Sequence, residues 1–250
     1  MSSFKDLVVV ISGASSGIGL ATGKAFIEQG ATVYNLDLVD SPDAKEFRYL
    51  TTDITKTESV KASVSQIEQE SGRMDVLVNN AGISFVGTVE ETTDEDWKRV
   101  FDVNVFGMAR LSSAALPLLR KSPVANIVNL CSVGALNGLP QRVLYDATKG
   151  AIFSMTLAMA TDHVREGIRV NCVSPGTVHT AFVEKMLLKF TDPEKERAAL
   201  NARQATGRMV TPDEVAGAIL YLADPRSAST TGISLEVDGG MHNLRVRPIQ

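Results

Sequence analysis

The chain has 250 residues, with 25 Lys and Arg against 29 Asp and Glu, so its formal net charge is −4. Hydrophobic residues make up 44% and the mean hydropathy is +0.04, which excludes a disordered or collagen-like chain, and the lack of a basic excess argues against a nucleic-acid partner. No apolar run reaches the roughly 20 residues of a membrane helix, and the first residues lack the pattern of a signal peptide, so we expect a cytoplasmic protein without a membrane partner.

Strands and helices are predicted to alternate along the whole chain. Five branched apolar residues at 7–11 indicate a strand buried on both faces, and a Gly-rich turn and a helix over 18–29 follow it. Further strands are expected at 32–38, 47–51, 75–78, 126–130, 169–173 and 233–237, and further helices at 56–71, 94–120, 144–165 and from Thr211 onward. This alternation predicts an α/β fold, a doubly wound parallel sheet in a single domain over residues 1–250.

Two segments depart from the alternation. Residues 177–210 are charge-rich and are expected to be irregular, and we interpret them as the substrate-binding segment of the domain. Residues 241–250 form a C-terminal tail, for which the sequence leaves two alternatives: a segment at a subunit interface, where it could edge a neighbouring active site, or a frayed terminus. Pro117 is expected to kink or loosen the end of the long helix over 94–120.

The turn after the first strand has the pattern G-x-x-x-G-x-G, formed by Gly13, Gly17 and Gly19. Glycines at these positions allow backbone N–H groups and the start of the helix to approach a pyrophosphate. Asp37 ends the second strand, where a carboxylate accepts hydrogen bonds from the ribose hydroxyls of NAD and repels the 2′-phosphate of NADP. The turn contains no Arg or Lys, so the sequence favours NAD. Other expected cofactor contacts here are Ser15, Ser16, Ile18 and Leu38.

Three polar residues in the second half of the chain form a candidate catalytic group. Tyr145 and Lys149 are four residues apart on a predicted helix, which places them on one face. An ammonium near a tyrosine favours the phenolate, which can exchange a proton with an alcohol or a carbonyl. Ser132 follows the strand over 126–130, at the carboxyl edge where such sheets bind ligands, and its hydroxyl could hold the same substrate oxygen.

Over essentially its full length the sequence resembles the short-chain dehydrogenase/reductase family. The matching residues are Gly13, Gly17, Gly19, Asp53, Asn79, Asn80, Ala81, Gly82, Asn104, Ser132, Tyr145, Lys149, Pro175, Gly176 and Thr180. The resemblance implies a Rossmann-type fold in which Tyr145 is the acid/base, Lys149 also binds the nicotinamide ribose and Asn104 holds a water of a proton relay. It further implies cofactor contacts by Asp53, Ile54, Asn80, Ala81, Gly82, Pro175, Gly176, Val178 and Thr180, and a homotetramer.

The substrate is predicted to be a carboxylate. Arg142 precedes the catalytic helix and Arg203 lies in the segment 177–210, and a guanidinium binds a carboxylate as a bidentate fork. Together with Ser132 and Tyr145, these arginines are the expected substrate residues. The sequence resembles the branch of dehydrogenases of 3-hydroxybutyrate and of 2-keto-3-deoxy sugar acids such as deoxyfuconate and deoxyrhamnonate. A third Arg of some members falls at Met186, beside Lys185.

The preferred interpretation is therefore an NAD-dependent dehydrogenase of a 2-keto-3-deoxy sugar acid such as 2-keto-3-deoxy-L-fuconate or -rhamnonate. The alternatives are a 3-hydroxybutyrate dehydrogenase, an NADP-dependent 3-oxoacyl thioester reductase, which Asp37 disfavours, and a cofactor-sensing binding protein without turnover. The last would typically lack the Tyr or the Lys. His163 and His242 have no partners at ligand spacing, so no metal is expected.

Overall fold

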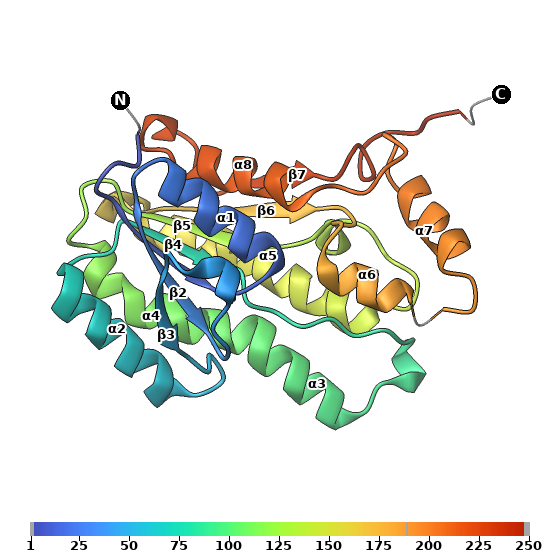
Figure 1. The fold of residues 1–250 in the computed structure, drawn as a ribbon, viewed down its shortest axis with the longest axis horizontal. Helices are drawn as coiled ribbons and strands as arrows, with labels where there is room; N and C mark the ends of the chain where they lie inside the picture. Colours follow the sequence, from blue (N-terminus) through green and yellow to red (C-terminus); the bar gives the residue numbers. More distant parts are fainter. Residues whose placement is uncertain (1–2, 189, 248–250) are drawn as a thin grey trace.

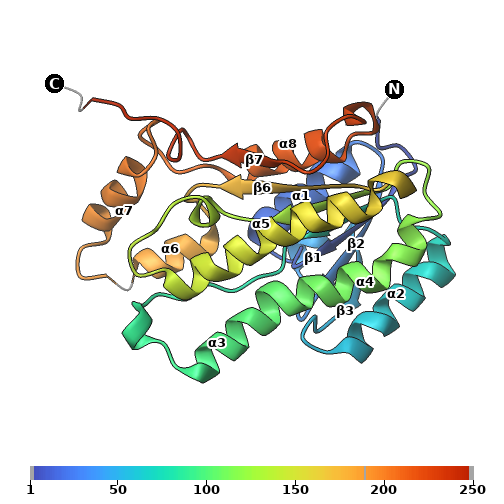
Figure 2. The ribbon, with the colours of Figure 1, turned by 180° about the vertical axis from the view of Figure 1, so that it is seen from behind.

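The computed structural model describes residues 3–188 and 190–247. A seven-stranded parallel sheet forms its centre, in the order β3-β2-β1-β4-β5-β6-β7 (Figures 1 and 2). The strands are β1 Val8–Ser12, β2 Thr32–Asp37, β3 Arg48–Thr51, β4 Val76–Asn79, β5 Asn126–Leu130, β6 Arg169–Pro175 and β7 Ser234–Val237. The expected doubly wound α/β sheet is confirmed.

Helices cover both faces of the sheet. On one face lie α1 (Gly17–Glu28) and α8 (Pro212–Ala223), and on the other lie α2 (Thr57–Ser71), α4 (Met108–Leu119) and α5 (Val143–His163) (Figures 1 and 2). Side chains of β1 alternate between two hydrophobic cores, with Val8 and Val10 packing in one and Val9 and Ile11 in the other. This two-sided burial explains why the strand has no polar alternation. No helix of the described residues is long and apolar enough to cross a membrane.

The helix expected over 94–120 is not continuous. It divides into α3 (Asp94–Phe101), a π-helical stretch at Asp102–Gly107 and α4. Pro117 lies inside α4 and does not end it, so the interruption lies elsewhere than expected. The wider turns surround Asn104, whose side chain bonds to neighbouring elements, and π-helical turns of this kind often occur at functional sites.

The prediction that residues 177–210 are irregular is wrong. The segment contains α6 (Ala181–Leu187) and α7 (Pro193–Ala202), which extend beyond the carboxyl end of the sheet (Figure 1). Both helices are short and charged, and their apolar residues form a small core of their own in which Leu187, Leu200 and Met209 are buried. Short helices are stabilised mainly by packing of this kind, which local sequence patterns do not reveal.

Candidate active site

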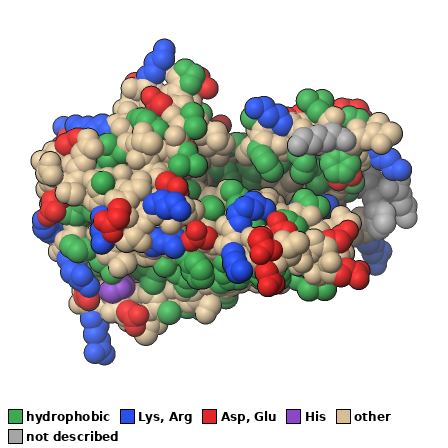
Figure 3. All heavy atoms as spheres, turned by 90° about the horizontal axis from the view of Figure 1, so that it is seen from below, with side chains coloured by type: hydrophobic (Ala, Val, Ile, Leu, Met, Phe, Trp, Pro, Cys, Tyr) green, Lys and Arg blue, Asp and Glu red, His purple; other side chains and the backbone are tan. Residues whose placement is uncertain are grey.

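A cavity of about 620 Å³ lies at the carboxyl edge of β5 and β6. In the space-filling view the surface is hollowed between two lobes, and hydrophobic side chains line the hollow (Figure 3). The cavity brings together expected residues from distant parts of the chain. These lining residues are Ile18, Asn80, Gly82, Ser132, Arg142, Tyr145, Lys149, Pro175, Gly176, Val178, Thr180 and Arg203.

The Gly-rich turn has the backbone geometry expected for binding a pyrophosphate. Gly13 and Gly17 have φ values of +73° and +55°, which favour glycine. A Cβ atom on Gly19 would lie 2.3 Å from the carbonyl oxygen of Gly13, so the helix packs directly on the turn. Ser16 precedes α1 without a side-chain capping bond, and the first turn of this twelve-residue helix contains no acidic residue. The positive end of α1 is therefore suited to a phosphate anion.

Buried polar residues hold this turn in place. The Asn80 side chain donates to the carbonyl oxygens of Ser12 and Gly13, both at 2.9 Å, and the Ser12 hydroxyl accepts from the Asn80 and Ala81 N–H groups. Asn35, fully buried in β2, accepts from the Ala14 N–H at 3.0 Å. Asn35 was not among the residues predicted from the sequence, although an amide inside an otherwise apolar strand is a usable signal.

Two carboxylates lie where the adenosine half of a dinucleotide is expected. Asp37 accepts hydrogen bonds from the N–H groups of Ser15 (3.1 Å) and Leu38 (2.7 Å), so its carboxylate lies beside the Gly-rich turn. Asp53 follows β3, and hydrogen bonds from the Thr55 hydroxyl and backbone hold the pKa of its carboxyl below the usual value. The side chain of Ile54 beside it is buried in the core, and contact of this residue with the cofactor stays a prediction.

The candidate catalytic side chains lie together on α5 and at the end of β5. The Lys149 Nζ atom is 5.5 Å from the centre of the Tyr145 ring and donates to the Leu130 carbonyl oxygen at 2.7 Å. This bond fixes the buried ammonium beside the ring. Ser132 accepts from the Gly134 N–H at 3.0 Å, which leaves its hydroxyl hydrogen available to a ligand oxygen.

Asn104 connects the π-helical stretch to α5. Its amide donates to the Thr148 hydroxyl at 3.1 Å and to the Ile83 carbonyl, and its oxygen accepts from the Ile83 N–H at 2.8 Å. The Thr148 hydroxyl in turn donates to the Tyr145 carbonyl oxygen at 2.7 Å. Thr148 is fully buried and was not singled out from the sequence, because a lone Thr on a helix carries no signal.

Arg142 and Arg203 both line the cavity. Arg142 donates to the Phe85 carbonyl oxygen at 3.1 Å. Neither Arg142 nor Arg203 takes part in the ion pairs that arginines form among the described residues. Burial and the nearby positive charge of Arg203 lower the pKa of Arg142. The Asp146 carboxylate lies near enough to Arg142 to act on it in the opposite direction, but it forms no ion pair with either arginine in the described residues. Two neighbouring guanidinium groups without an ion-pair partner create a site for an anion.

The segment after β6 is bound to the end of α7. Gln204 is 2% exposed, and its side-chain oxygen accepts from the Thr177 N–H at 3.1 Å. Val178 forms an isolated bridge with Val210, and the Thr180 hydroxyl caps α6. The expected nicotinamide-contacting residues are thereby linked to α6 and to the end of α7, where Arg203 lies. Gln204 could not be identified as this link from the sequence alone.

The C-terminal tail begins at this cavity. Met241 is one of the lining residues, and His242 shares a hydrogen bond of 2.7 Å with the Asn137 side chain. The tail therefore edges the cavity of its own chain. Contact with a neighbouring subunit remains a prediction, as does the homotetramer, and residues 248–250 lie outside the described part of the chain.

The site combines a Gly-rich turn suited to a pyrophosphate, a Tyr and Lys pair, and a cavity at the sheet edge. This combination is typical of dinucleotide-dependent oxidoreductases. The sequence profile described as enoyl-(acyl carrier protein) reductase matches residues 13–242. The chain is 37% identical to 2-(S)-hydroxypropyl-CoM dehydrogenase 3 of Xanthobacter autotrophicus over 248 residues, which covers 95% of this chain and 97% of the relative.

Solved structures give the same result. The ligand-free aldohexose dehydrogenase of Thermoplasma acidophilum superposes with a TM-score of 0.94 at 34% identity, covering 100% of this chain and 99% of the other. The structure of ElxO with NADP bound has a TM-score of 0.87 at 28% identity, covering 94% and 98%. The chain belongs to the short-chain dehydrogenase/reductase family. It is an oxidoreductase that acts on alcohol or ketone groups with a nicotinamide cofactor.

Proposed function

We propose that this enzyme is an NAD-dependent dehydrogenase of a hydroxy acid whose carboxylate binds between Arg142 and Arg203. The observation that carries the proposal is the shared cavity, in which both guanidinium groups lie with Ser132 and Tyr145. An anion there would relieve the repulsion between the two positive charges. A planar carboxylate can also accept hydrogen bonds from both guanidinium groups.

The proposed chemistry divides between cofactor and protein. The nicotinamide, when bound, supplies the hydride acceptor for oxidation of a secondary alcohol. Tyr145 would take the proton of the substrate hydroxyl, and the adjacent Lys149 ammonium would stabilise the phenolate form that accepts it. Ser132 would donate a hydrogen bond to the same oxygen and orient it. Asn104 would hold the far end of a proton path that runs past Lys149.

The cavity walls favour an acid with few hydroxyl groups. Val183, Met186, Leu200 and Met241 line the cavity together with the two arginines. A sugar acid would leave several hydroxyl groups against this apolar wall, and an unpaired buried hydroxyl costs about 1–3 kcal/mol. Within the hydroxy acids, this supports 3-hydroxybutyrate-like substrates over the 2-keto-3-deoxy sugar acids that the sequence favoured.

The choice of NAD rests on Asp37. Its carboxylate lies beside the Gly-rich turn, held by the Ser15 N–H, where it could accept from two ribose hydroxyls. A 2′-phosphate at that position would meet a negative charge. The Asp37 carboxylate therefore disfavours an NADP-dependent thioester reductase.

A substrate panel tests the proposal. Initial rates would be measured with NAD and with NADP on 3-hydroxybutyrate, 2-keto-3-deoxy-L-fuconate and butan-2-ol, which lacks a carboxylate. We expect the highest kcat/KM with NAD and an acid. Tyr145→Phe should lose turnover but still bind NADH, measured by fluorescence titration. Higher kcat/KM with NADP would overturn the cofactor assignment, and equal kcat/KM for butan-2-ol and the best acid would overturn the carboxylate site.

A further inference from the structure

Arg203 is held at the cavity by a helix that has few contacts with the sheet domain. It is the C-cap residue of α7, which packs on α6 beyond the carboxyl end of the sheet (Figure 1). Arg142, by contrast, lies at the start of the long helix α5 and is fixed by the Phe85 carbonyl. The two guanidinium groups repel each other when no anion lies between them. Interactions elsewhere on α7 therefore oppose this repulsion, and the small core around Leu200 and the bond of Gln204 to Thr177 are two of them.

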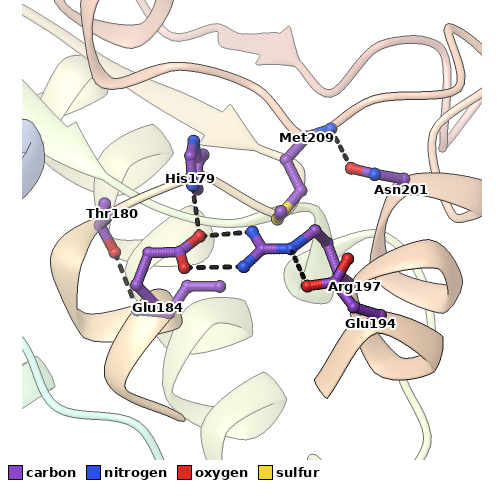
Figure 4. Close-up of polar contacts among 8 residues, drawn as sticks. His179, Thr180, Glu184, Glu194, Arg197, Asn201 and Met209 are labelled. Carbon is purple, nitrogen blue, oxygen red and sulfur yellow. Dashed lines mark hydrogen bonds and ion pairs between the residues drawn. The ribbon is translucent and has the colours of Figure 1, made fainter. Parts of the chain in front are cut away.

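A bidentate ion pair joins the two helices. Arg197 of α7 donates through Nη1 and Nη2 to the two carboxylate oxygens of Glu184 on α6, at 2.6 and 2.8 Å. The two side chains point toward each other across the gap between the helices, and Glu194 and His179 flank them (Figure 4). The pair is part-exposed, with 31% of the Arg197 and 37% of the Glu184 side chain accessible. Hydrogen bonds from Arg197 and His179 lower the pKa of Glu184 to about 2, so the carboxylate stays charged at neutral pH.

The same cluster is connected to the expected cofactor side of the cavity. His179 contacts the Glu184 carboxylate, and its own N–H donates to the Val210 carbonyl oxygen at 2.8 Å. Near the end of α7, Asn201 accepts from the Met209 N–H at 3.1 Å, as Figure 4 shows. Gln204 then binds Thr177. Arg203 thus lies between two anchored residues, and the Glu184–Arg197 pair is a charged contact in the middle of the same helix.

We propose that Glu184 and Arg197 are positioning residues that hold α7 against α6 and so keep Arg203 opposite Arg142 for the substrate carboxylate. This inference rests on the proposed function, because the ion pair is expected to affect the binding only of substrates that carry a carboxylate. Loss of the pair would let α7 move outward under the repulsion between the two arginines. Binding of an acid would weaken, while proton transfer at Tyr145 and hydride transfer to the nicotinamide would be unaffected.

Four proteins separate the possible outcomes: the wild type, Arg197→Met, Arg203→Met and the double variant. Each would be assayed with 3-hydroxybutyrate and with butan-2-ol. We expect Arg203→Met to raise the KM of the acid. Arg197→Met should raise it about fivefold, the factor that corresponds to about 1 kcal/mol, the upper range for an exposed ion pair. The kcat for the acid and the kcat/KM for butan-2-ol should change less than twofold, and Arg197→Met should add nothing once Arg203 is gone.

A second bidentate pair of the chain provides a matched control. Arg208 forms a bidentate pair with Glu214 at 2.9 and 2.6 Å, but this pair joins α8 rather than α7. Arg208→Met should leave the KM of the acid unchanged. Lysine at position 197 (Arg197→Lys) should restore part of the lost affinity.

The two proposals fail in different ways. If Arg203→Met leaves the KM of the acid unchanged, the carboxylate site itself is wrong. If Arg203→Met raises that KM but Arg197→Met does not, the positioning role is wrong. It is also wrong if Arg197→Met raises the KM by the same factor in the Arg203→Met background as in the wild type. An equal loss with butan-2-ol would show a general structural role and would also overturn the inference.

Discussion

Replacement of Gly19 by alanine should weaken cofactor binding severely, although alanine is the better helix former. Gly19 lies in the first turn of α1, and a Cβ atom there would be 2.3 Å from the Gly13 carbonyl oxygen and 2.6 Å from the Asn80 amide nitrogen. The first distance is about 1 Å inside an ordinary carbon–oxygen contact. Both obstacles are fixed, because Gly13 is part of the turn and Asn80 is bonded to it. The turn or the helix must therefore move by about that distance.

The magnitude follows from two opposing terms. Alanine in a helix interior gains about 1 kcal/mol over glycine, whereas overpacking of this kind costs about 1–3 kcal/mol. We therefore expect a small net loss in the free energy of unfolding. The effect on binding should be larger, because a displacement of about 1 Å in a ligand-positioning element can cost up to about a hundredfold. The dissociation constant of NADH should rise by at least about tenfold.

Gly217→Ala is the matched control. Gly217 lies inside α8, and no atom comes within 4 Å of its expected Cβ position. This variant should raise the melting temperature by about 2–4 °C, the shift for about 1 kcal/mol in a chain of this size, and leave NADH affinity unchanged. Fluorescence titration with NADH and thermal unfolding measure both effects. If Gly19→Ala binds NADH like the wild type and gains the same stability as Gly217→Ala, the steric argument is refuted.

Two further predictions concern buried hydrogen bonds and acid stability. Thr148→Val removes the hydrogen bonds that link Asn104 to the Tyr145 carbonyl oxygen. The kcat should therefore fall about tenfold with the KM for NAD unchanged. An unaltered kcat would contradict the positioning of Tyr145 through these bonds. Hydrogen bonds from Arg226 lower the pKa of Asp224 from 3.8 to about 2, so its contribution to stability is complete above about pH 4 and is lost as the pH falls toward 2. Asp224→Asn should therefore be less stable than the wild type at pH 7 in urea unfolding, by a margin that shrinks below about pH 4. A margin independent of pH would count against the ion pair.

Much of the fold could be predicted from local patterns. The strand over 126–130 and the start of α8 at a Thr-Pro capping box lie where the sequence placed them, and the other strands agree within two residues. Buried parallel strands are continuous apolar runs, and capping residues mark helix ends, so both signals are contained in a few adjacent residues. The π-helical stretch around Asn104 was not predicted, because its cause is a bond to Ile83 on another segment.

The candidate site divides in the same way. The glycines of the turn, Tyr145 and Lys149 were identifiable because their spacing alone places them on one loop or one helix face. Asn35, Thr148 and Gln204 were not, because each acts on a residue at least three positions away through a side chain whose direction depends on packing. Arg203 was named from the sequence, but its neighbour Arg142 lies 61 positions earlier in the printed chain, and only the fold brings them to one cavity.

The sequence by itself therefore determined the class of fold and the residues that carry the oxidoreductase chemistry, since strand burial, helix capping and the catalytic spacing are local properties. Only the tertiary structure showed that the segment 177–210 contains two helices and that an ion pair joins them. It also decided which side chains line the cavity. These features arise between elements far apart in the chain. Their energies come from packing and paired charges, which exist only after the sheet has brought the elements together.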